Sequence, residues 1–136
     1  MIDPNLVAQE PDRIRANLDR RGPDPAIHRD VDRIVALSSR RRELITQRDE
    51  LRAERNALST QVGALYKQGK ADEAAALKER VNAGSTRTAE IEAELDRVEA
   101  ERTDLAMRLP NLLHDAVPPG KGDEDNVVVR SWGQPA

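Results

Sequence analysis

Leucines recur at every seventh position through the middle of the chain, with polar residues between them. They are Leu37, Leu44, Leu51, Leu58 and Leu65. A seven-residue apolar repeat is the period of a helix that packs along a partner helix. No proline interrupts residues 26–109, so long helices can form there.

A second heptad pattern follows the first after a short break. Its positions, spaced alternately four and three residues apart, are Leu77, Val81, Gly84, Thr88, Ile91, Leu95, Val98, Arg102, Leu105 and Leu109. In the break, Gly69 suits a left-handed helix end and Asp72 suits the next N-cap. Two heptad helices joined by so few residues must be antiparallel neighbours. We therefore predict an all-α fold: a long antiparallel two-helix coiled-coil hairpin, with helices over about 27–68 and 72–109, each roughly 60 Å long.

The two ends of the chain have a different pattern. Pro11 begins a short N-terminal helix over about 11–21, with Ile14 and Leu18 on its apolar face. After Pro110 we expect an extended C-terminal connector, in which β-branched residues 126–130 resemble a strand without a partner. The predicted organisation is an arm over residues 1–109 and a connector over 110–136.

One stretch of the second helix is a poor helix former. Residues 82–88 are rich in small and polar side chains, and Gly84 and Thr88 fall on heptad positions. We expect thin packing there, opposite Leu58 and Arg55, and a loose, kinked or frayed helix.

Composition supports the hairpin and argues against an active site. Charged residues make up 35% of the chain and aromatic residues 1%, and there is no cysteine. Such a composition suits long helices better than a globular core. His28 and His114 are far apart and no phosphate-binding glycine loop is present, so we expect no metal, no cofactor and no catalytic residues in these 136 residues. Without an apolar span or a signal peptide, we expect a cytoplasmic protein.

The net charge of −3 is unevenly distributed. Residues 29–68 hold nine basic and six acidic side chains, whereas residues 72–108 hold six basic and ten acidic ones. One interpretation is structural: Arg41, Arg48 and Arg55 repeat along the first helix and can pair with carboxylates of the second. Those carboxylates would be Glu90, Glu94 and Glu101.

The other interpretation is RNA binding. Polar groups on outer positions of the first helix, and at the turn, are free to meet phosphates and ribose hydroxyls. They are Arg52, Asn56, Ser59, Lys67 and Lys70. Tyr66 could stack on an exposed base or cover the hairpin end.

Several short motifs, in order, resemble the N-terminal arm of bacterial-type seryl-tRNA synthetase. They are Ile2-Asp3-Pro4, Pro11-Asp12 with Ile14-Arg15, residues 52–59 followed by Val62-Gly63, Leu109-Pro110-Asn111, Val117-Pro118, Asp123-Glu124 with Asn126, and Arg130 with Trp132-Gly133. The sequence departs from the family's pattern in two places. Thr60 stands where a basic residue is common, and residues 84–88 are more polar and less helix-prone than the family's second helix usually is.

The resemblance implies an arm that grips the long variable arm and elbow of tRNA(Ser). Serylation would use ATP and Mg²⁺ in a class II catalytic domain that these residues do not include, and that domain would form the homodimer. The implied tRNA-binding residues are Arg48, Arg52, Arg55, Asn56, Ser59, Tyr66, Lys67 and Lys70. Two alternatives stay open: an adaptor hairpin that binds proteins, and a stand-alone homologue that binds tRNA without charging it.

Overall fold

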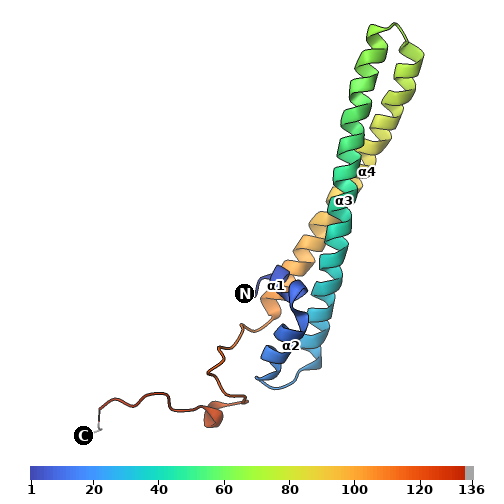
Figure 1. The fold of residues 1–136 in the computed structure, drawn as a ribbon. Coiled ribbons are helices and arrows are strands. Elements are labelled where there is room, and N and C mark those ends of the chain that lie inside the picture. The colour runs from blue at the N-terminus through green and yellow to red at the C-terminus, as the bar shows by residue number, and fades with distance from the viewer. Residues whose placement is uncertain (134–136) are drawn as a thin grey trace. The chain divides into compact units, whose positions relative to one another are not determined.

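A computed structural model describes residues 1–133 and shows an all-α fold (Figure 1). Its helices are α1 (Pro4–Gln9), α2 (Pro11–Asp19), α3 (Pro25–Lys67) and α4 (Ala71–Arg108), followed by a 3₁₀ turn, η1 (Asp123–Asp125). The long helices α3 and α4 pack closely as the predicted antiparallel hairpin. Residues 134–136 of the expected connector lie outside the described residues.

The turn between α3 and α4 forms as the sequence indicates. Gly69 has a φ of 75°, in the left-handed region that favours glycine. The Lys70 N–H donates to the carbonyl of Leu65 (3.0 Å) and the Gly69 N–H to that of Tyr66 (3.1 Å), the two bonds of a Schellman motif. Asp72 is not the N-cap, because α4 already begins at Ala71; its charge lies in the first turn, where the helix dipole favours it.

The chain divides into two compact units. The terminal unit comprises residues 1–38 and the described residues from 102 onward, and the hairpin unit comprises residues 39–101. We describe each unit by itself.

The terminal unit contains two short helices where the sequence predicted one. The Asp3 carboxylate accepts a hydrogen bond from the Asn5 N–H (2.8 Å), and Pro4 occupies the first turn of α1. The predicted helix over 11–21 is α2, which ends at Asp19. The buried apolar side chains of this unit are Ile2, Val7, Ile14, Leu18, Val31, Ile34, Leu37, Leu105, Ala106 and Leu109.

A buried arginine joins three helices of the terminal unit. Arg102 of α4 is only 4% exposed. Its Nε donates to the Ser38 hydroxyl of α3 (3.1 Å) and its Nη2 donates to the Asn5 carboxamide (2.9 Å). These hydrogen bonds explain how an arginine is tolerated at a heptad position.

The segment after α4 is held along α2 and Arg20 by hydrogen bonds to its backbone. The Asn17 carboxamide accepts from the Leu113 N–H (2.8 Å) and donates to the Leu113 carbonyl (2.9 Å). Arg20 donates to the carbonyl of Asp115 (3.2 Å), and the Gly120 N–H donates to the carbonyl of Arg20 (3.0 Å). Residues 126–130, expected as a strand without a partner, form no β-ladder, since no partner edge is available within residues 1–133.

The hairpin unit has a narrow core. Leu44 and Ile91 are its largest fully buried side chains, with 0% and 1% of their surface exposed, and Leu58, Ala74 and Val98 are also buried. Leu51 is only half-buried. The apolar contact is therefore one stripe wide.

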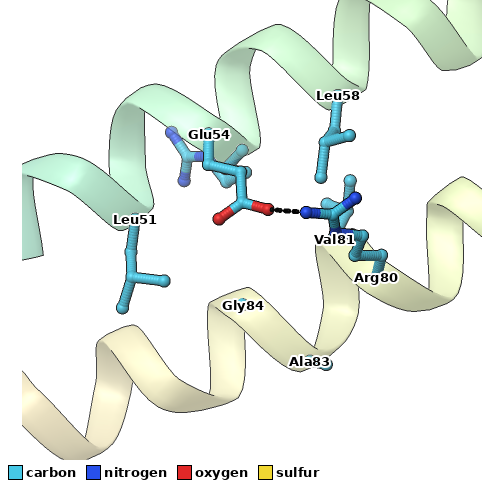
Figure 2. Close-up of a pocket in the computed structure, with 8 residues that line it drawn as sticks. Leu51, Glu54, Leu58, Arg80, Val81, Ala83 and Gly84 are labelled. Atoms are coloured by element: carbon cyan, nitrogen blue, oxygen red, sulfur yellow. Dashed lines mark ion pairs between the residues drawn. The ribbon is translucent and has the colours of Figure 1, made fainter.

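The weak stretch of α4 is helical but poorly packed. The helix does not fray there as the sequence allowed: α4 continues unbroken through residues 82–88. The thin packing expected there is seen as a hollow of about 180 Å³ beside Gly84, with Leu51, Leu58 and Val81 in its lining (Figure 2). Glycine has no side chain to fill the space, and a Cβ added at Gly84 would meet no atom within 4 Å.

Replacing Leu44 by alanine should destabilise the chain more than replacing Leu51. The Leu44 side chain is fully buried, so Leu44→Ala should cost about 2–5 kcal/mol through lost burial and a new cavity. Leu51 is half-exposed beside an existing hollow, so Leu51→Ala should cost about 1–2 kcal/mol. Urea unfolding followed by circular dichroism measures both; equal losses would contradict the packing described.

Alanine at two glycines should have opposite effects, although an added Cβ would meet no atom within 4 Å at either. Gly84→Ala should raise the free energy of unfolding by about 0.5–1 kcal/mol through helix propensity. Gly69→Ala should lower it by about 1–2 kcal/mol, because alanine resists the left-handed conformation. The same unfolding assay tests both, and stabilisation by Gly69→Ala would refute the turn.

Candidate nucleic-acid interface

Five of the predicted binding residues of α3 follow one stripe along the hairpin unit. Arg48, Arg52, Arg55, Ser59 and Tyr66 are spaced by four, three, four and seven residues, which places them along one side of a helix. All are exposed except Arg48, which is half-buried. The side chains of Asn56, Lys67 and Lys70 are also exposed.

Ion pairs cross between α3 and α4, but with partners that differ from those predicted. Arg41 pairs with Glu99, and Glu94, expected as an arginine partner on the heptad row, instead pairs with Arg40 (2.8 Å). Hydrogen bonds to Glu94 first, and then to Glu43, raise the pKa of Arg40. These pairs stabilise the hairpin only weakly, because their side chains are open to solvent, where water and salt screen the charges.

Arg52 and Arg55 exchange their expected roles, one of which was to pair with α4 and the other to face outward. Arg52, which the sequence placed on an outer position, pairs with Glu92 of α4. Arg55, which the sequence placed on the arginine row facing α4, donates to the neighbouring Asn56 carboxamide (3.3 Å). Within residues 1–133, no carboxylate oxygen lies within 4.0 Å of the Arg55 guanidinium. Arg55 is therefore the arginine of this pair that is open to an external anion.

Arg48 has a local partner as well. Its guanidinium contacts the carboxylate of Asp49, the next residue of α3, at 3.2 Å. Glu90, predicted as a partner for an α3 arginine, instead pairs with Arg87 of its own helix (3.2 Å). Neither interaction joins the two helices.

Two hollows between α3 and α4 are lined in part by the stripe. The first, of about 220 Å³, is lined by Arg52, Arg55, Ser85, Thr88, Ala89 and Glu92. The second, of about 290 Å³, is lined by Ser59, Val62, Tyr66, Lys78, Val81 and Asn82. We name them the arginine hollow and the tyrosine hollow.

The α4 residues of these hollows were missed by the sequence reasoning. Ser85, Lys78 and Asn82 flank the heptad positions of α4, so the heptad pattern itself could have placed them beside the stripe. All of the binding residues predicted from the sequence lie on α3 or at the turn, so the facing positions of α4 were not among them.

The chemistry of the stripe suits an anionic polymer. Guanidinium groups and hydroxyls bind phosphate, and an exposed aromatic ring offers a stacking surface; Tyr66 is 53% exposed. Within the described residues, no group of three His, Asp or Glu side chains could hold a metal ion. No helix in that part of the chain has the length and apolar character needed to cross a bilayer.

A comparison with known families agrees with this chemistry. The family model described as the seryl-tRNA synthetase N-terminal domain matches residues 1–113. The match supports a tRNA-binding arm, and it does not distinguish the bacterial type. Because the match spans most of the chain, this protein belongs to the seryl-tRNA synthetase N-terminal domain family.

Proposed function

We propose that the hairpin unit grips tRNA(Ser) at its long variable arm and elbow and positions it for serylation. The observation that carries the proposal is the open stripe along α3, in a chain of the seryl-tRNA synthetase family. Arg55 supplies an arginine without a carboxylate partner in the described chain, Tyr66 an exposed ring, and Lys67 and Lys70 supply positive charge at the turn. Structured RNA is bound through such phosphate and ribose contacts.

The chemistry of the synthetase belongs, in this proposal, to a class II catalytic domain. That domain would bind ATP and Mg²⁺, activate serine and form the homodimer. The hairpin would contribute RNA affinity alone. The protein would act in the cytoplasm.

The test is filter binding of the full 136-residue chain to tRNA(Ser) and to a tRNA with a short variable arm. We expect preference for tRNA(Ser), and an affinity that falls steeply between about 50 and 200 mM salt because phosphate contacts release counterions. Arg55→Ala should weaken binding and reduce the salt slope by about one. The helicity of the Arg55→Ala variant should be unchanged, because the Arg55 side chain is exposed.

Arg97→Ala is the matched control, since Arg97 is an exposed arginine of the same unit that lines neither hollow. It should leave the affinity nearly unchanged. If both tRNAs bind equally and the affinity is flat across salt, the RNA proposal fails and an adaptor that binds proteins is favoured.

A further inference from the structure

The arginine hollow is lined by a carboxylate, Glu92, although a negative charge repels the phosphates of RNA. Glu92 extends from α4 to pair with Arg52, so it occupies one of the two guanidinium groups in the hollow. We propose that Glu92 competes with an RNA phosphate for Arg52, holding it in the free arm and releasing it when a phosphodiester enters the hollow. This inference rests on the proposed function.

The lining of the hollow fits a phosphodiester group. Arg52 and Arg55 enter from α3 one helical turn apart, and Ser85 and Ala89 on α4 are small, which leaves about 220 Å³ between the helices. Thr88 donates its hydroxyl to the Gly84 carbonyl (2.9 Å), whereas the Ser85 hydroxyl has no partner among the described residues. Two guanidinium groups and one hydroxyl are donors of the kind that bind phosphate oxygens.

The charges of the hollow show why Glu92 matters. Two arginines and one glutamate line the hollow, which gives it a single net positive charge; the Arg52–Glu92 ion pair neutralises the rest. A phosphate that binds Arg55 meets the negative charge of Glu92 nearby. The phosphate gains a second guanidinium only if Arg52 leaves Glu92.

The exchange is physically accessible because the ion pair is open to solvent. The side chains of Arg52 and Glu92 are 48% and 45% exposed. Exposed ion pairs are weak and screened by salt, so a phosphate can replace the carboxylate at little cost. If the ion pair served only to join α3 to α4, its removal would not change the affinity for RNA.

Glu92→Gln tests the proposal on the full chain with tRNA(Ser) as the probe. Glutamine keeps the length and helix propensity of the side chain but removes its charge. The affinity should rise about two- to fivefold, the range that corresponds to the loss of one exposed charge interaction.

Glu90→Gln is the matched control, because it removes the same charge from the same helix where the partner is Arg87. It should change the affinity less than Glu92→Gln. Equal gains in the two variants would overturn the proposal, since they would reflect net charge alone.

A double variant separates competition for Arg52 from simple repulsion of the phosphate. In an Arg52→Ala background, Glu92→Gln should raise the affinity no more than Glu90→Gln does. A gain that persists without Arg52 would reject competition. If the wild-type chain binds no tRNA, the proposed function itself fails; if it binds and these differences are missing, only the role of Glu92 fails. Circular dichroism on each variant establishes that the hairpin is folded.

Discussion

Two packed helices can bury only one stripe of each other's surface, and the hairpin unit depends on that stripe. Leu44 and Ile91 in this stripe are fully excluded from water, and Leu58 and Val98 are buried beside them along the helices. Each residue outside the stripe is left to interact with solvent, with a charge on the other helix, or with a ligand. The polar surface is therefore large relative to the core, which a chain with 35% charged residues can supply.

This constraint places the same side chains under two demands. An arginine beside the apolar stripe is close enough to reach a carboxylate of the other helix and exposed enough to reach a phosphate. Arg41 meets the first demand through Glu99, and Arg55 is open to the second. Arg52 is subject to both demands, because it pairs with Glu92 of α4 and both side chains line the arginine hollow.

The heptad pattern was sufficient to predict the hairpin, the turn at Gly69 and the helix ends within a few residues. Such features follow from apolar burial and backbone conformation, which the sequence expresses directly. The arginine partners could not be predicted in the same way. An arginine side chain is long enough to choose among several carboxylates on the facing helix, and the choice between Glu90, Glu92 and Glu94 depends on rotamers.

Two segments at the ends of the chain could not be fully predicted, for other physical reasons. Helix α1 is too short to show periodicity, although Asp3 and Pro4 formed a recognisable start signal. Residues 126–130 have β-branched side chains, but strand propensity acts only where another edge is available for pairing. Local preference alone was therefore not enough to predict either segment.

The paired hydrogen bonds between Asn17 and Leu113 imply an asymmetry in tolerance to mutation. Both bonds from the Asn17 carboxamide go to the backbone of Leu113, so a different side chain at position 113 leaves them intact. Position 17 has no such freedom, because only a side chain that both donates and accepts at that length can satisfy the same N–H and carbonyl. The route of the chain after α4 is thus encoded in α2, almost a hundred residues earlier in the sequence.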